Sequence, residues 1–220
     1  MKFFSINCSD ELKEIGYHPQ TEIEPESFGF LSIGSTNEVR RNVLRDDNVR
    51  INLLINEKSK VTDYLYNSSI TFGFVVSSRL KKIIETCSLP PHRFYPVTAI
   101  HKGQYLDYFW FHYMVDIYQH VDLMASSITI FHKFNFNIID KIKIESIEKV
   151  KKIKSLLPFD QAMKFNEIIL RKGFPGYDVF DLTGVQFIPI VSERFLDKLQ
   201  KNLVTGFESQ EYNQIVDLSH

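Results

Sequence analysis

Glycine is scarce in this chain of 220 residues. Nine glycines make up about 4% of it, against a usual share of about 7%. None of them forms a G-x-G-x-x-G fingerprint or a phosphate-binding P-loop, so these two modes of nucleotide binding are excluded. A G-x-S-x-G nucleophile elbow is also absent, and the sequence therefore gives no sign of nucleophilic catalysis by a serine.

Cysteine is equally rare. Cys8 and Cys87 are the only two, and neither belongs to a C-x-x-C pair or to a Cys/His cluster with zinc-ligand spacing. This excludes a disulfide framework and the common structural zinc sites. We expect neither a catalytic residue nor a cofactor.

Long hydrophobic runs and a charge excess are missing as well. The most apolar segment, Tyr105 to Met124, is interrupted by charged residues, and a membrane helix needs about 20 consecutive apolar residues. The apolar start of the chain stops at Asn7, too early for a signal peptide. With 26 Lys and Arg against 27 Asp and Glu, no global charge attracts nucleic acid. We expect a cytoplasmic protein with neither a membrane nor a nucleic acid as its partner.

What is present is the composition of a globular protein, with 44% hydrophobic and 24% charged residues. Short apolar runs between polar clusters predict a strand-rich first third. Helical spacing predicts helices later in the chain. We therefore expect an α+β fold, with mixed α/β as the alternative, forming a single domain or two closely packed halves. The halves would be a strand-rich part over about 1–100 and a helix-rich part over 101–220. One predicted helix falls within residues 104–131, and two more span residues 146–157 and 159–173.

Two segments share a pattern that predicts a strand, a serine cap and a helix. Phe72 to Thr86 and Phe187 to Lys201 align without a gap. Ser77 aligns with Ser192, and both can cap the first turn of the helix that follows. Two copies are too few for a solenoid, and any strand that enters a helix can show this pattern. Repetition and coincidence both remain open.

The best candidate for a metal site is the series His112, Asp116 and His120. On the helix predicted here, residues four apart would point to one side. Two imidazoles and a carboxylate suit zinc or iron. The simpler reading is the polar stripe of an apolar helix, because no fourth-ligand motif such as H-E-x-x-H accompanies the three residues. A metal-dependent enzyme or metal-binding domain is therefore the alternative function.

Six lysines fall between Asp140 and Lys154. Such a run can bind nucleic acid. The segment has no arginine and no aromatic residue for base stacking, so a solvated helix face is the better interpretation. Asp178 and Asp181 can be paired carboxylates, although turn-rich surroundings favour aspartates that bond to their own backbone.

Three short motifs lie within residues 70–208: Val191 to Arg194, the segment Leu203 to Gly206, and a tyrosine-rich stretch before Asp122 and Ser126. Together they resemble a family of bacterial immunity proteins from polymorphic toxin systems. The resemblance implies a cytoplasmic protein without enzymatic activity that binds and blocks a cognate toxin. Matching positions would then be fold elements rather than toxin contacts: Ser77, Arg79, Asp122, Ser126, Ser192, Glu193, Arg194 and Gly206.

Overall fold

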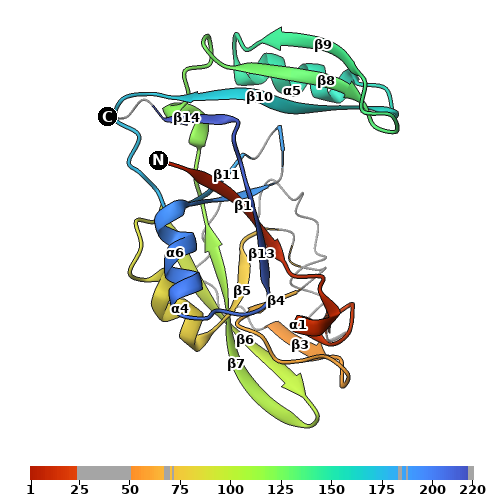
Figure 1. The fold of residues 1–220 in the computed structure, drawn as a ribbon, viewed down its shortest axis with the longest axis vertical. Coiled ribbons are helices and arrows are strands. Elements are labelled where there is room, and N and C mark those ends of the chain that lie inside the picture. The colour runs from red at the N-terminus through yellow and green to blue at the C-terminus, as the bar shows by residue number, and fades with distance from the viewer. Residues whose placement is uncertain (24–50, 67–69, 71, 183–184, 187, 218–220) are drawn as a thin grey trace. The chain divides into compact units, whose positions relative to one another are not determined.

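A computed structural model describes the chain apart from residues 24–50, 67–69, 71, 183–184, 187 and 218–220 (Figure 1). The chain divides into two compact units, and each is built from segments that are distant in sequence. Unit 1 contains residues 1–5, 115–193 and 210–220, and unit 2 contains residues 6–114 and 194–209. Much of the first third of the chain, which was predicted to be rich in strands, lies outside the described residues, including the apolar run at 28–34.

Unit 2 is built on a six-stranded sheet with the strand order β2-β3-β6-β7-β5-β4. Its longest pairing is the antiparallel hairpin of β6 and β7, which closes through Lys102 and Gly103. Both turn residues have positive φ angles, 51° and 76°, as a two-residue hairpin turn requires. The strands are β2 (Thr21–Ile23), β3 (Ile51–Ile55), β4 (Tyr64–Leu65), β5 (Phe74–Ser77), β6 (His92–His101) and β7 (Gln104–Tyr113).

Among the described residues of unit 2, the helices are α1 (Leu12–Ile15), α4 (Ser78–Ile84) and all but the first residue of α6 (Glu193–Lys201). Leu80 and Ile84 of α4 and Phe195 and Leu199 of α6 surround one small apolar cavity together with Phe74 of the sheet. Burial of these side chains supplies the main force that holds the two helices in place. A separate core contains Leu53, Val97, Trp110 and their neighbours.

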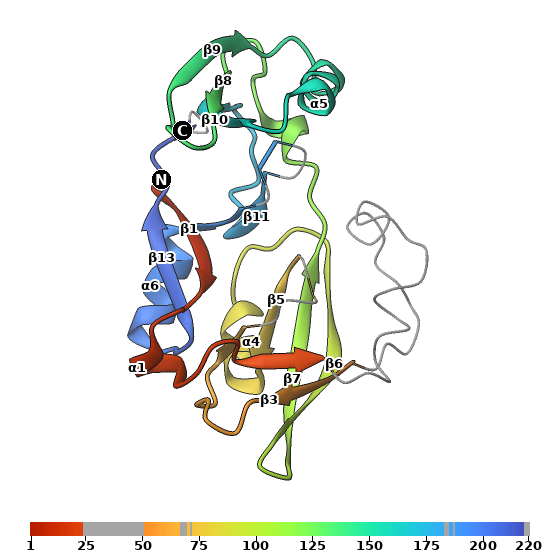
Figure 2. The ribbon, with the colours of Figure 1, turned by 90° about the vertical axis from the view of Figure 1, so that its right-hand side faces the viewer.

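Unit 1 contains a four-stranded sheet with the order β14-β10-β8-β9. The helix α5 (Ile147–Leu156) lies against one face of it (Figure 2). Ser146 caps this helix, because its hydroxyl accepts a hydrogen bond from the Lys149 amide at 3.1 Å. The other elements are the 3-10 helix η2 (Ile117–His120) and the strands β8 (Ser127–His132), β9 (Ile138–Lys143), β10 (Gln161–Leu170) and β14 (Ile215–Asp217).

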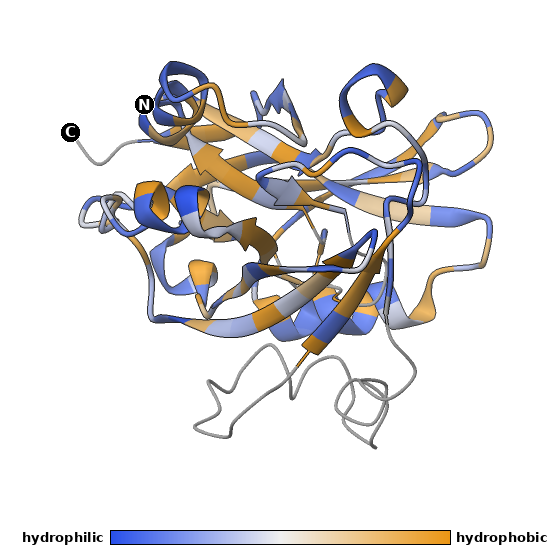
Figure 3. Ribbon diagram, turned by 90° about the horizontal axis from the view of Figure 1, so that it is seen from below, coloured by the Kyte–Doolittle hydropathy of each residue, from blue (hydrophilic) through white to orange (hydrophobic). Residues whose placement is uncertain are grey.

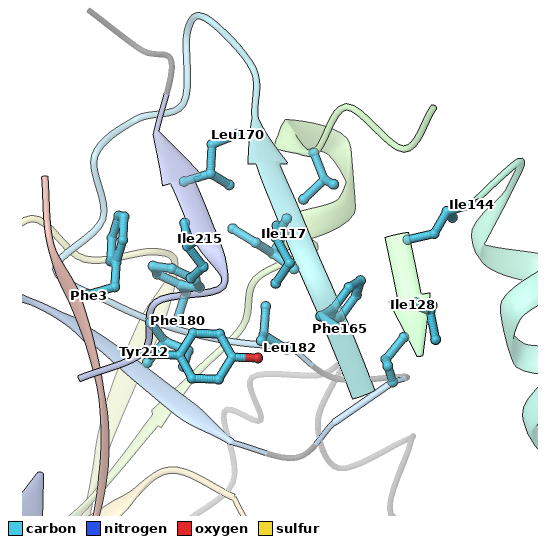
Figure 4. Close-up of a cluster of buried hydrophobic side chains, with 14 of the residues drawn as sticks. Phe3, Ile117, Ile128, Ile144, Phe165, Leu170, Phe180, Leu182, Tyr212 and Ile215 are labelled. Atoms are coloured by element: carbon cyan, nitrogen blue, oxygen red, sulfur yellow. The ribbon is translucent and has the colours of Figure 1, made fainter. Parts of the chain in front are cut away.

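The core of unit 1 gathers residues from both ends of the chain. Phe3 and Ile215 contact a cluster that includes Phe165 and Phe180 (Figure 4). The rings of Phe3 and Phe180 meet edge to face at 5.5 Å between centroids, a favourable aromatic geometry. The terminal segments therefore belong to the folded core of this unit.

A third sheet has the strand order β11-β12-β1-β13. Its strands are β1 (Phe3–Cys8), β11 (Val179–Asp181), β12 (Pro189–Ser192) and β13 (Phe207–Glu211). β12 pairs antiparallel with both β11 and β1.

The predicted α+β fold with a helix-rich C-terminal part is wrong, because the protein is mostly β. The helix expected within residues 104–131 is replaced by β7, η2 and β8, and the one expected over 159–173 is replaced by β10. The helix over 146–157 is confirmed as α5, and in both units the strand leads directly into the helix, β5 into α4 and β12 into α6. Hydrophobic and hydrophilic stretches alternate along the strands in Figure 3. No described helix has the length and apolar character needed to cross a bilayer.

Candidate functional site

The Asp63 carboxylate lies at the centre of a polar cluster in unit 2. It accepts a hydrogen bond from the Ser77 hydroxyl at 2.7 Å, and its backbone carbonyl accepts one from the Ser77 amide at 2.8 Å. The Ser77 oxygen also caps α4 by accepting from the Leu80 amide at 3.1 Å. Asp63 thereby fixes the junction between β5 and α4 through both its side chain and its backbone.

Arg79, in the first turn of α4, approaches the same carboxylate. Its Nε lies 3.1 Å from Oδ1 of Asp63, and its Nη2 bonds to Oδ2. The guanidinium also donates to the carbonyls of Asn202 and Leu203, at 3.0 and 3.1 Å. This planar fork, matched to a carboxylate, is the geometry for which arginine is suited. Arg79 therefore links Asp63 to the segment that follows α6.

The segment that follows α6 closes the cluster through Thr205 and Gly206. The Thr205 amide and hydroxyl donate to Oδ2 of Asp63, at 3.1 and 3.2 Å. Gly206 has φ +90°, and a Cβ added there would lie 2.1 Å from the Tyr64 carbonyl oxygen. Only glycine fits this close backbone approach.

Burial raises the pKa of the Asp63 carboxyl, but its hydrogen bonds from Arg79, Ser77 and Thr205 act in the opposite direction and prevail. The pKa of Asp63 is therefore below its ordinary value. The same hydrogen bond to Asp63 raises the pKa of Arg79. A carboxylate held charged and surrounded by donors is a poor proton acceptor. The cluster has the features of a structural clamp rather than of an acid-base site.

A second cluster in unit 1 repeats the pair of Asp63 and Ser77. The Ser192 hydroxyl donates to Oδ1 of Asp178, and the Ser192 amide donates to the Asp178 carbonyl at 3.0 Å. Fourteen residues separate the partners in both clusters. The backbone pairing matches too, since Tyr64 faces Val76 as Val179 faces Val191.

The equivalence extends to neighbouring strands. In the six-stranded sheet, four neighbouring strands have the order β4-β5-β7-β6. The third sheet has the equivalent order β11-β12-β1-β13. The helix α4 follows β5 and leads to β6, as α6 follows β12 and leads to β13. The two sequence segments are thus copies of one structural unit. In one copy the third strand is β7, and in the other it is the N-terminal strand β1.

The remaining family-motif positions lie apart from these clusters or on the surface. Ser126 is buried in unit 1, where its hydroxyl donates to the Asp122 carbonyl at 2.7 Å and accepts from the Ile169 amide at 3.0 Å. Glu193 and Arg194 are exposed in the first turn of α6. Their interpretation as fold elements stays a prediction.

The helix that would align His112, Asp116 and His120 does not exist. His112 is buried on β7, where its ring stacks on Trp110 at 4.9 Å. Asp116 caps η2, and His120 ends it against Phe174. Within the described ranges, no three His, Cys, Asp or Glu side chains are grouped as metal ligands. The metal hypothesis depended on three residues on one side of a single helix, and these residues lie instead on β7 and in and before η2.

The lysine segment runs through β9 and α5, and most of its lysines are exposed. Aromatic residues lie nearby in the sequence: Phe134, Phe136 and Phe159 are 71%, 73% and 87% exposed. The sequence interpretation was confined to residues 140–154 and therefore missed these three phenylalanines. Exposed aromatic side chains in a group mark interaction surfaces.

Asp63 was also not among the candidate residues predicted from the sequence. Extending the gapless alignment of Phe72 with Phe187 upstream places Asp63 opposite Asp178. The two carboxylates were therefore detectable as a matched pair. Asp181, the other candidate carboxylate, ends β11 without an equivalent, since position 66 is a tyrosine.

Comparison with protein families places the chain among the immunity proteins, because a model of an immunity protein family matches residues 43–214. The chain belongs to the family described as Imm11. The match contains the whole of α4, α5 and α6 and confirms the resemblance to immunity proteins. No curated protein matches the chain.

Proposed function

We propose that the protein binds a cognate bacterial toxin and neutralises it without enzymatic activity of its own. The observation that carries this proposal is the match to an immunity protein family over residues 43–214. An immunity protein protects the cell that makes the toxin, and this one acts in the cytoplasm. The mechanism is steric and electrostatic: a preformed surface covers the toxin's active site or substrate channel.

The polar cluster around Asp63 is consistent with a binding protein. The best-formed polar cluster, around Asp63, is saturated by donors from Ser77, Arg79 and Thr205. A substrate needs free space beside the catalytic residue in order to react with it. The oxygens of Asp63 are instead bonded to Ser77, Arg79 and Thr205, which belong to the fold itself. Stable protein complexes bury about 1,200 to 2,000 Å² of surface and depend on a few aromatic or arginine anchors.

Growth rescue tests the proposal. The toxic C-terminal domain encoded beside this protein's gene is expressed from an inducible promoter in a bacterial host, with and without this protein. Growth restored by co-expression supports neutralisation. Death in both cultures, with both proteins present on an immunoblot, contradicts it. Co-expression with an unrelated toxin domain is the control, because protection should extend only to the cognate toxin.

A further inference from the structure

The four-stranded sheet of unit 1 carries aromatic and basic side chains that contact one another around the turn from β8 to β9 and the start of β10. We define the hairpin surface as Phe131, Lys133, Phe136, Ile138, Phe159 and Lys164. All six residues belong to unit 1. They come from β8, the turn into β9, β9 itself, the turn before β10, and β10.

Direct contacts join the members of the hairpin surface in two groups, one around Phe131 and one between Lys133 and Phe159. The Phe131 and Phe136 rings stack at 6.3 Å between centroids. Lys164 Nζ lies 5.3 Å above the Phe131 ring, and Lys133 Nζ lies 5.0 Å from the Phe159 ring. Lys133 Nζ also donates to the Phe159 carbonyl at 2.6 Å. The patch is therefore a structured surface in which cations are held over aromatic rings.

Strand register puts part of the hairpin surface on the face of the sheet opposite α5. Phe131 pairs with Ile138 across β8 and β9 and with Ala162 across β8 and β10, and directly opposed residues share a face. The neighbouring Ile130 and its partner Met163 are buried in the core on the side of α5.

β9 adds a second sign of an interaction site. It is the edge strand of its sheet, and five of its six residues are exposed. Natural proteins usually protect such edges. The charged residues Lys141 and Lys143 protect part of this edge, but Ile138 is 61% exposed beside them.

The charge of this region sets the chemistry of its partner. Residues 127–172 contain ten Lys and Arg against five Asp and Glu, whereas the rest of the chain contains 16 against 22. Within the described structure, Lys133, Lys141 and Lys164 form no ion pair with a carboxylate. A positive field around aromatic anchors complements an acidic protein surface and accelerates encounter with it.

We propose that the hairpin surface is the toxin-binding surface and that it recognises an acidic face of the toxin. This inference rests on the proposed function. A protein partner is favoured over nucleic acid because the isoleucine and the phenylalanines offer an apolar centre, and because both lysines of the surface are held over rings. Phe136 and Phe159 are the anchors, and Lys133 and Lys164 provide charge complementarity.

Binding of the purified toxin domain by surface-immobilised protein tests the inference. The variant with Phe136→Ser and Phe159→Ser removes both anchors, and we expect its affinity to fall at least about a hundredfold. The variant with Lys133→Glu and Lys164→Glu should slow association and reduce its dependence on salt. Tyr105→Ser is the matched control, because Tyr105 is 77% exposed in the β6–β7 hairpin of unit 2; its affinity should not change.

The outcomes separate the inference from the proposed function. If the wild-type protein and both hairpin variants bind the toxin equally, the hairpin surface is not the site, and the proposed function stands. If the wild-type protein itself neither binds nor rescues, both proposals fail. A fluorescent oligonucleotide that binds the wild-type protein and is released by the lysine variant would identify nucleic acid as the partner and overturn the inference. Circular dichroism melting should show all variants folded, since the changed side chains are exposed.

Discussion

The Arg79 guanidinium faces the Asp63 carboxylate with two parallel hydrogen bonds, Nε to Oδ1 and Nη2 to Oδ2. The carboxylate is mostly buried, whereas the arginine side chain is 53% exposed. The pair holds the first turn of α4 to the strand that precedes β5. Because Arg79 also binds the carbonyls after α6, the pair joins segments more than 120 residues apart.

Replacing Asp63 with asparagine should destabilise unit 2. The substitution keeps the shape of the side chain but removes the charge that Arg79, Ser77 and Thr205 stabilise. Hydrogen bonds to a charged group contribute about 1.5 to 3 kcal/mol, so we expect a loss of about 2 kcal/mol in the free energy of unfolding. Urea denaturation measures it. Asp197→Asn is the control, since Asp197 forms only an exposed pair with Lys201 at 4.0 Å, and it should cost less than about 0.5 kcal/mol.

The contribution of Asp63 should depend on pH in a defined direction. Its folded-state pKa is below the ordinary value, so the unfolded state binds more protons in acid and stability rises with pH there. The contribution is complete above about pH 4, the ordinary range of an aspartate, and is lost as pH falls through the lower folded-state pKa. The stability difference between wild type and Asp63→Asn should therefore shrink below about pH 4. A difference that stays constant down to pH 2 would be inconsistent with this assignment.

Gly206→Ala should be far more harmful than the same change at Gly173. Both glycines have left-handed φ angles, +90° and +93°, so each substitution has a backbone cost of about 1 to 2 kcal/mol. At Gly206 the new Cβ would also lie 2.1 Å from the Tyr64 carbonyl oxygen, whereas at Gly173 it meets nothing within 4 Å. Thermal melting compares the two variants, and equal melting temperatures would show that the contact at Gly206 is unimportant.

Ser77→Ala should lower stability by about 1 to 2 kcal/mol, because it removes the cap of α4 and a donor to Asp63. The next residue provides the control: Ser78 is exposed and makes a single long hydrogen bond of 3.5 Å to the Asp107 carbonyl. Ser78→Ala should change the free energy of unfolding by less than about 0.5 kcal/mol. Equal denaturation midpoints for the two variants would argue against the capping role.

The strand-cap-helix units were predictable because their signals are local. An apolar alternation, a serine and a helical spacing lie within fifteen residues in each case, and the offset between copies also leads to Asp63 and Asp178. The partners of these units could not be predicted in the same way. β5 pairs with β7 from the same half of the chain, whereas β12 pairs with the N-terminal β1.

Two helix predictions failed because the strands do not show the regular alternation of buried and exposed residues by which a strand is identified in a sequence. β7 lies inside a six-stranded sheet, and Tyr108 and Trp110 to Tyr113 are all buried, so the strand reads as a continuous apolar run. β10 is interrupted by an irregularity between Phe165 and Glu167. This shifts its buried residues from 163 and 165 to 168 and 170, a spacing that imitates a helix.

The hairpin surface could not be predicted from the sequence, because its members contact one another across positions that are far apart in the chain. Lys133 and Phe159 are 26 residues apart and meet only because β8 and β10 are neighbours in the sheet. The lysine segment by itself has no aromatic residue. The fold brings its charge and the exposed phenylalanines into one unit.

Calorimetric titration of the purified toxin domain into this protein tests the central claim most directly. The account predicts a saturable heat of binding with about one toxin per chain, a dissociation constant in the nanomolar to micromolar range typical of specific complexes, and loss of the toxin's activity at the same ratio. Absence of binding heat at several temperatures, with the toxin fully active beside an excess of folded protein, would contradict it.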